Sequence, residues 1–241
     1  MKTSLFIIIV LFSGCIAGTV HGLVNLAIVE PYLDAAIGIE NQHLFESGEA
    51  KDTPEFWAEY SSYRVWQKGG QILAGAILGT SIGALFGIVF GYARNVLPGG
   101  NFVKKSLFLA AIMWATLYII PMIKYPANPP TVGDPETIVL RQALYVAFIA
   151  ISGLGALGFY YVHKKISKKA LAFAGYAGFM ALMFAVMPNN PDPVTAPEEL
   201  VTNFRITSAI AVSSFWLSVA VVFGALWQKL QPDKTAQSKI Q

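Results

Sequence analysis

Charged residues and cysteine are both scarce in this chain of 241 residues. Only 13% of the residues are charged and 55% are hydrophobic, whereas soluble domains carry about 25% charged residues. The composition therefore argues against a soluble domain and predicts a multi-pass membrane protein. The single cysteine, Cys15, excludes an intrachain disulfide and gives no information on the redox compartment.

Sequence motifs of enzymes and nucleotide-binding proteins are also missing. The chain contains no P-loop, no HExxH, no CxxC and no glycine-rich dinucleotide fingerprint, and no nucleophile lies beside an obvious base. We therefore expect neither an enzyme nor a bound cofactor. The net charge of +3 comes from short basic clusters at the ends of apolar segments, so we also expect no nucleic-acid partner.

Six apolar segments of 18 to 26 residues alternate with polar connections, and a helix of about 20 apolar residues crosses a bilayer. We predict an all-α, multi-pass membrane helix bundle that forms one integral membrane domain over residues 1–241. The expected spans are residues 4–29, 69–93, 106–123, 138–162, 170–187 and 206–227.

The first apolar segment begins like a bacterial lipoprotein signal, with Lys2, an apolar stretch and then Gly14-Cys15. The apolar run continues to Val29, whereas the apolar core of a signal peptide has about 7–15 residues. Cleavage at Cys15 would leave a stub too short to span the membrane. We therefore expect an uncleaved first helix.

Acidic and basic residues alternate between successive connections of the predicted spans. All but one of the 14 acidic residues fall in every second connection, and most of the 17 basic residues fall in the others or near the termini. The positive-inside rule places the basic set in the cytoplasm. Both termini are then cytoplasmic, the protein lies in the cell (inner) membrane, and an acidic external surface attracts cations. The basic set is Lys2, Arg94, Lys104, Lys105, Lys164, Lys165, Lys168, Lys169, Lys229, Lys234 and Lys239.

Glycines recur every four residues in the first two predicted spans. Spacing of four places them on one face of a helix, where two backbones can approach closely. This pattern favours static helix packing, and a sliding or gating contact is the alternative. The glycines are Gly14, Gly18 and Gly22 in the first span, and Gly75, Gly79, Gly83, Gly87 and Gly91 in the second.

The chain also repeats with an offset of 62, because seven of the fourteen residues 126–139 are identical in 188–201. The predicted repeat units, residues 106–162 and 170–227, each consist of a helix, an external proline-rich loop and a helix, in the same direction. Pro135-Glu136 and Pro197-Glu198 predict helix starts. Helix capping is the favoured role of Glu136 and Glu198, and lining an external vestibule is the alternative.

His21 lies within the first predicted span, toward its external end. An ionisable side chain inside a membrane indicates a functional site by default, and imidazole binds Co, Ni, Cu and Zn. Asn25 follows on the same helix face, and Glu30 lies at the external mouth. The three residues could form a polar track for a metal ion or proton. The alternative for His21 is an interhelical hydrogen bond to a hydroxyl or a backbone carbonyl.

His43 and Glu46 form a second candidate metal site, in the first external connection. Their spacing of three residues would present both side chains to one ion if the connection formed a helical turn. An acidic connection offers such pairs by chance, so a solvated surface is the alternative. With three histidines and one cysteine in the whole chain, the ligand supply suits transient passage of a metal better than storage.

The first repeat loop contains the stretch Lys124–Gln142, KYPANPPTVGDPETIVLRQ. The second lies in residues 187–216, which contain Pro197-Glu198-Glu199-Leu200, Phe204, Ser208 and Phe215-Trp216. Both stretches resemble those of the predicted cobalt transporter subunit CbtA family, and residues 187–216 are the closest match. Two features depart from the family pattern. Members are usually described with about five spans, and Asn189 follows Pro188 where a histidine is typical.

The resemblance implies uptake of cobalt for cobalamin synthesis, together with CbtB, a small single-span partner rich in histidine. Transported Co²⁺, or a related divalent cation, would be substrate and not cofactor. The runner-up hypothesis is a non-transporting membrane scaffold subunit of a larger complex, in which the glycine faces and proline-rich loops bind partners. Either hypothesis is compatible with homo- or hetero-oligomers in the lipid bilayer.

Overall fold

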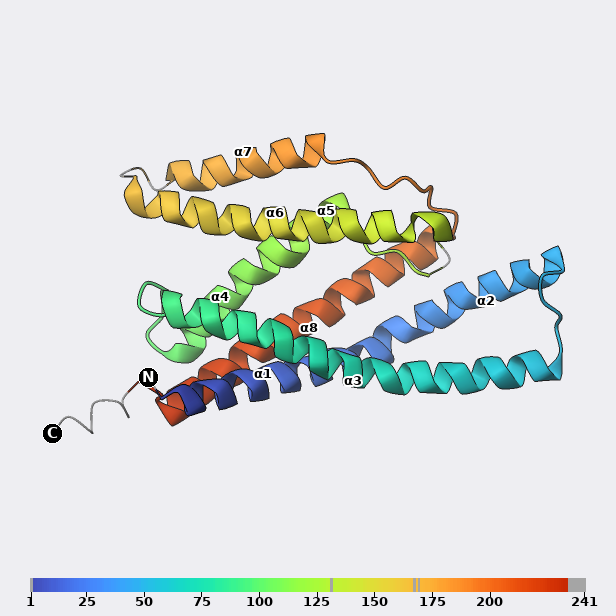
Figure 1. Ribbon diagram of the computed structural model, residues 1–241, viewed down its shortest axis with the longest axis horizontal. Helices are drawn as coiled ribbons and strands as arrows, with labels where there is room; N and C mark the ends of the chain where they lie inside the picture. The colour runs from blue at the N-terminus through green and yellow to red at the C-terminus, as the bar shows by residue number, and fades with distance from the viewer. Residues whose placement is uncertain (1, 131, 167, 169, 234–241) are drawn as a thin grey trace. The chain divides into compact units, whose positions relative to one another are not determined.

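A computed structural model describes residues 2–130, 132–166, 168 and 170–233, and it is built from helices and connecting loops (Figure 1). Within these residues no strand occurs, so the predicted all-α fold is confirmed. Of the predicted basic residues, Lys169, Lys234 and Lys239 lie outside the described part. The elements are α1 (Thr3–Val24), η1 (Asn25–Val29), α2 (Glu30–Ser47), α3 (Pro54–Ala93), α4 (Phe102–Trp114), η2 (Ala115–Ile119), α5 (Ile120–Lys124), η3 (Pro135–Thr137), α6 (Ile138–Lys165), α7 (Ala170–Val186) and α8 (Glu198–Leu230).

Each of the six predicted spans coincides with an apolar helix. Five helical stretches are long and apolar enough to cross a membrane, and α7 is a shorter apolar helix of 17 residues. At a rise of about 1.5 Å per residue, α7 extends roughly 26 Å, slightly less than the hydrocarbon core of a bilayer. The five longer stretches are Thr3–Ser47, Pro54–Ala93, Phe102–Lys124, Pro135–Lys165 and Glu198–Leu230.

The connection between the first two predicted spans is mostly helical, whereas only a single helical turn was considered for it from the sequence. Helix α2 continues the first span to Ser47 and ends where Gly48 adopts a left-handed conformation, with φ of 78°. Helix α3 starts at Pro54, and the Thr53 side chain accepts a hydrogen bond from the Phe56 N–H. The connection is rich in residues such as Glu, Gln and Ala, which favour helices. Hydropathy measures polarity and not helix propensity, so it does not predict a helix in a polar segment.

The contacts divide the chain into two compact units. Unit 1 comprises Met1–Ala111 with Thr202–Gln241, and unit 2 comprises Ile112–Val201. The single membrane domain and the repeat units 106–162 and 170–227 stay predictions.

Glycines bring α1 and α3 of unit 1 together, side by side in Figure 1. A Cβ atom added to Gly14 would lie 2.6 Å from the carbonyl oxygen of Gly79, and one added to Gly79 would lie 2.5 Å from the Cα of Gly18. Real Cβ atoms do not approach so closely, so only glycine fits this contact. The predicted packing face is confirmed for these glycines, whereas Gly91 has no neighbour within 4 Å and lies outside it.

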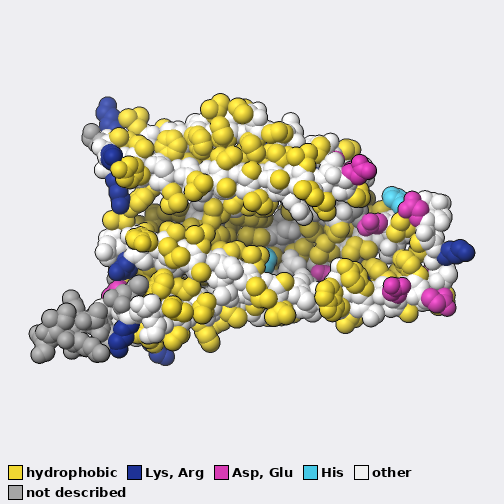
Figure 2. Space-filling model, in the orientation of Figure 1, with side chains coloured by type: hydrophobic (Ala, Val, Ile, Leu, Met, Phe, Trp, Pro, Cys, Tyr) yellow, Lys and Arg dark blue, Asp and Glu magenta, His cyan; other side chains and the backbone are white. Residues whose placement is uncertain are grey.

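An aromatic cluster of Phe86, Phe90, Phe223 and Trp227, all fully buried, joins α3 to α8 within unit 1. Arg94 lies over the Trp227 ring at 5.8 Å from its centroid and pairs with Asp233 at 3.2 Å. In unit 1, acidic side chains gather mainly where α2 and α3 meet, and basic ones gather mainly at the opposite end (Figure 2). Hydrophobic side chains cover most of the visible face between these ends.

In unit 2, α6 and α7 form an antiparallel pair (Figure 1). The short π-helix η2 contains Thr116, and the buried Ser152 hydroxyl on α6 donates a hydrogen bond to the Thr116 backbone carbonyl at 2.5 Å. The Tyr176 hydroxyl on α7 lies 2.8 Å from Ser152 Oγ. These hydrogen bonds give partners to the polar groups around η2 inside the apolar part of the unit.

Candidate functional site

Glu30 is a buried acidic residue at the junction of η1 and α2, with 5% of its surface exposed. The short π-helix η1 contains one residue more than an α-helical turn. The residues that follow it are therefore rotated about the helix axis by about 100° relative to a regular α-helix. Glu30 thereby packs against α3, where the Gln71 amide donates to Glu30 Oε2 at 3.1 Å. The Asn25 amide in turn donates to Gln71 Oε1 at 2.7 Å.

Arg64, on α3, supplies the counter-charge for Glu30. Its Nη2 donates to Glu30 Oε1 and to Asp34 Oδ1, the latter at 2.7 Å. Lys68 pairs with the other oxygen of Asp34 at 2.7 Å. The negative charges of two carboxylates are therefore neutralised by the positive charges of two side chains. We call this set the ion-pair network: Asn25, Glu30, Asp34, Arg64, Lys68 and Gln71.

The buried position of Glu30 makes its partners obligatory. A carboxylate removed from water costs several kcal/mol unless it is paired and hydrogen-bonded. The Glu30 and Arg64 side chains are only 6% and 10% exposed, whereas those of Asp34 and Lys68 are 42% and 33% exposed. The network therefore changes from buried at Glu30 to hydrated at Lys68.

Four of the network residues were not identified as site residues from the sequence: Asp34, Arg64, Lys68 and Gln71. A signal was present, because Glu30 and Asp34 are spaced by four residues, and Arg64, Lys68 and Gln71 follow at intervals of four and three. Such spacing places each set on one helix face. Complementary acidic and basic stripes on two neighbouring helices indicate that the stripes face each other.

His21 contacts α8 within unit 1. Its Nδ1 lies 2.8 Å from the carbonyl oxygen of Ala211. Since a carbonyl can only accept, Nδ1 carries the proton, and a neutral ring then presents Nε2 as an acceptor. The interhelical hydrogen bond to a backbone carbonyl, considered from the sequence, is present. It leaves one ring nitrogen with the lone pair needed for a metal or proton.

The predicted polar track is assembled in part. Asn25 and Glu30 join through Gln71. Among the hydrogen bonds of the described residues, none links His21 to these side chains. His21 precedes Asn25 by about one helical turn, so it lies deeper in the apolar segment than the network.

His43 and Glu46 lie exposed on α2. In the described part of the chain, no three His, Cys, Asp or Glu side chains come close enough together to hold a metal ion. His43 and Glu46 therefore form at most a two-ligand surface pair, and a metal role for them stays a prediction.

Glu136 and Glu198 are exposed in the first turns of η3 and α8. The predicted helix starts are confirmed, since η3 begins at Pro135 and α8 begins at Glu198. At the first of them the capping group is Asp134, whose carboxylate accepts from the Glu136 N–H at 2.8 Å. The vestibule role of the two glutamates stays a prediction.

Within unit 2 the two proline-rich loops are tied to each other by Asp192. Its Oδ2 accepts from Thr137 Oγ1 at 2.5 Å and from the Asp134 N–H at 3.1 Å, and it pairs with Arg141 Nε at 3.0 Å. The Lys124 ammonium donates to Asn189 Oδ1 at 2.6 Å. Asn189, at the position where the resembling family has a histidine, is thus a partner for a lysine.

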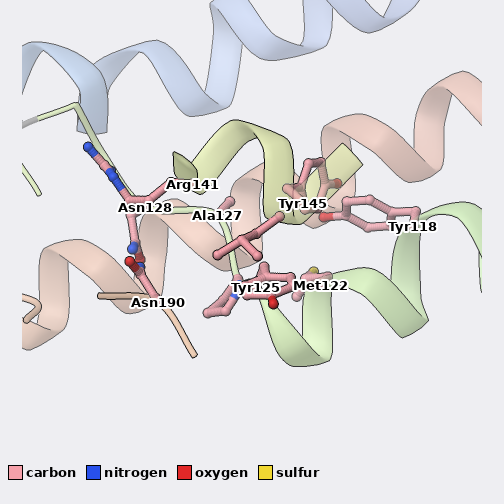
Figure 3. Close-up of a pocket in the computed structure, with 10 residues that line it drawn as sticks. Tyr118, Met122, Tyr125, Ala127, Asn128, Arg141, Tyr145 and Asn190 are labelled. Atoms are coloured by element: carbon pink, nitrogen blue, oxygen red, sulfur yellow. The ribbon is translucent and has the colours of Figure 1, made fainter. Parts of the chain in front are cut away.

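A cavity of about 270 Å³ opens beside these loops in unit 2 (Figure 3). Its lining is aromatic and amide-rich, with one methionine. Tyr125 donates its hydroxyl to the Pro188 carbonyl at 2.5 Å. Burial raises the pKa of the Tyr125 hydroxyl, which keeps it protonated as a donor. The lining residues are Tyr118, Met122, Tyr125, Pro126, Ala127, Asn128, Arg141, Leu144, Tyr145 and Asn190.

Comparison with protein families supports the resemblance of the loops. The model of the CbtA family, described as a probable cobalt transporter subunit, matches residues 3–228. The chain belongs to the CbtA family. The match covers both units, and together with the apolar helices it identifies a membrane protein of a cobalt transporter family. As CbtA is described as a subunit, a partner is implied. Comparisons with curated proteins and with solved structures gave no match.

Proposed function

We propose that this chain is the membrane subunit that carries a divalent transition-metal cation inward, with cobalt for cobalamin synthesis as the substrate. The observation that carries the proposal is the buried carboxylate of Glu30, next to the acidic end of unit 1, in a chain that belongs to a cobalt transporter family. Buried ionisable groups in membrane proteins mark ion pathways by default.

The route begins at the exposed acids of α2 and α3 and continues to Glu30 and then His21. The ion-pair network has no net charge, so an incoming dication is accommodated only when Arg64 moves away from Glu30. Repulsion between the guanidinium and the dication favours that movement. Past Glu30, the next ligand is the Nε2 of His21, and the amide of Asn25 lies between them.

The route supplies few ligands, and the partner supplies the rest. A small single-span protein of the CbtB type, rich in histidine, provides the imidazoles that this chain lacks. The exposed pair His43 and Glu46 and the vestibule glutamates Glu136 and Glu198 raise the local cation concentration. Both termini are cytoplasmic and the protein lies in the cell (inner) membrane, with energy supplied by the membrane potential, a proton gradient or the partner.

A second function, a non-transporting scaffold, is favoured by one observation. Both carboxylate oxygens of Glu30 are occupied, by Arg64 and by Gln71, as expected of a group that holds helices together. Under this alternative, the chain copurifies with a larger complex. Replacing His21 with Ala would then leave the metal content of cells unchanged.

The experiment that separates the two functions is accumulation of radioactive cobalt in a host deficient in cobalt transport. The chain is expressed alone and with a histidine-rich single-span partner, and its amount in the membrane is measured. The proposal requires uptake above the empty-vector level that excess cold cobalt competes away. The scaffold would be favoured if cobalt accumulation equalled the empty-vector level both with and without the partner, while the protein was present in the membrane.

A further inference from the structure

The Tyr118 hydroxyl in unit 2 is buried and has no hydrogen-bond partner among the described residues. The residue as a whole is 8% exposed. Tyr118 lies in the short π-helix η2, and π-helical segments within α-helices recur at functional sites. A buried hydroxyl without a hydrogen-bond partner lowers the free energy of unfolding. The Tyr118 side chain forms part of the wall of the cavity beside the proline-rich loops.

The remaining polar groups of the cavity are mainly donors. Asn190 uses its Oδ1 to accept from the Asp192 N–H, which leaves its amide NH₂. Arg141 uses Nε and one hydrogen on each terminal nitrogen for Asp192, Thr137 and the carbonyls of Val132 and Asp134. A guanidinium has five N–H groups, so one remains on each terminal nitrogen.

The two ends of the cavity are polar and its middle is apolar. Figure 3 shows the hydroxyls of Tyr118 and Tyr145 near each other at one end, and the amides of Asn128 and Asn190 at the other. Met122, Leu144 and the ring of Tyr125 contribute the apolar surface. An apolar wall with a few placed polar groups is the usual construction of a small-molecule site.

From this lining we infer that the cavity binds a small organic acid, a carboxylate on an apolar or aromatic body. The ligand must supply acceptors, because Tyr118, Asn190 and Arg141 offer donors. Of the ten described lining residues, Arg141 is the one with a charged side chain, and no Asp or Glu lies in the wall. A bare cation would find no counter-charge there. The lining residues belong to unit 2, whereas the residues of the proposed cobalt route belong to unit 1.

The test uses the full chain purified in detergent and benzoate as the probe, with benzamide as its uncharged analogue. Binding is followed by saturation-transfer NMR. A ligand of this size binds in the millimolar range or tighter at ordinary ligand efficiency. We expect benzoate to bind at least tenfold more tightly than benzamide. Benzamide also reports any partitioning of the aromatic ring into the micelle.

The decisive variant is Tyr118→Phe, which removes the hydroxyl and keeps the ring. Because the hydroxyl has no partner in the fold, the variant should unfold at the same temperature as the wild type or higher. It should bind benzoate about tenfold more weakly, the effect of one hydrogen bond to a charged ligand. The matched control is Tyr92→Phe, in unit 1, where Tyr92 is 89% exposed.

Three binding results would each overturn the inference. The first is no benzoate binding at tens of millimolar to the wild type, and the second is equal affinity for benzoate and benzamide. The third is a Tyr118→Phe variant that binds benzoate as the wild type does. A lower melting temperature for that variant would show that the hydroxyl has a structural partner, and it would count against the site as well.

Discussion

The guanidinium of Arg64 on α3 pairs with the buried carboxylate of Glu30 on α2. The pair joins two helices at the end of their apolar segments, where one charged group without the other would be uncompensated. Removing one partner of a buried ion pair costs about 3–5 kcal/mol. An exposed pair contributes about 0–1 kcal/mol.

The first prediction concerns this difference between buried and exposed partners. Arg64→Gln should lower the free energy of unfolding by about 3 kcal/mol, because Glu30 keeps its charge and loses its counter-ion. Lys68→Gln is the control, and its loss should stay below about 1 kcal/mol, since Lys68 and Asp34 are partly hydrated. Denaturant titration in detergent measures both. Equal losses would contradict the burial argument.

A double substitution extends the same prediction. Glu30→Gln together with Arg64→Gln removes both buried charges and should recover a large part of the stability lost in Arg64→Gln alone. If the double variant were less stable than either single variant, the two side chains would contribute through packing and not through their charges.

The second prediction concerns the glycine contact of α1 and α3. Gly79→Val should prevent close packing, because even a Cβ at this position would lie 2.5 Å from the Cα of Gly18. We expect loss of the folded protein from the membrane. Gly91→Val is the matched control on the same helix, since nothing lies within 4 Å of Gly91. Immunoblots of membrane fractions report the amounts, and normal levels of Gly79→Val would rule out this helix contact.

The third prediction concerns the link between the two proline-rich loops. Asp192→Ala should free three donors, on Thr137, Asp134 and Arg141, and should lower stability by about 2 kcal/mol. It should also expose the loop to proteolysis. Glu198→Ala removes an exposed carboxylate of the same region and should change neither property. Limited digestion followed by mass spectrometry of the fragments locates the cut. Equal digestion of both variants would mean that Asp192 does not hold the loops.

The fourth prediction concerns topology. In a Cys15→Ser background, a cysteine introduced at Ser47 should react with a membrane-impermeant maleimide added to intact cells, because we expect the α2–α3 connection outside. A cysteine at Asn101, before α4, should react only after the cells are opened. Labelling of the second position in intact cells would reverse the assignment of the two faces.

Much of the fold follows from hydropathy and local chemistry. The apolar segments coincide with helices, the glycines at 14, 18 and 79 lie at a helix contact, and Pro135 starts a helical turn. The continuation of helices through residues 30–47 and 54–68 was missed, because hydropathy registers polarity and not helix propensity.

The site was predictable only in part, for reasons of distance along the chain. His21, Asn25 and Glu30 stand out because polar groups are rare within an apolar segment. Arg64 lies 34 residues from Glu30 and Asp192 lies 51 residues from Arg141. Their pairing depends on which helix faces meet. That information lies in tertiary packing, although the acidic and basic stripes on α2 and α3 gave a usable signal.

In the proposed function, Glu30 and His21 lie on the path of the metal. The most direct measurement is cobalt uptake by Glu30→Gln and by His21→Ala, each normalised to the amount of protein in the membrane. Glu59→Gln, which removes an exposed carboxylate of α3, is the control. We expect at least a tenfold loss of uptake for the two route variants and wild-type uptake for the control. Wild-type uptake in both Glu30→Gln and His21→Ala would contradict it.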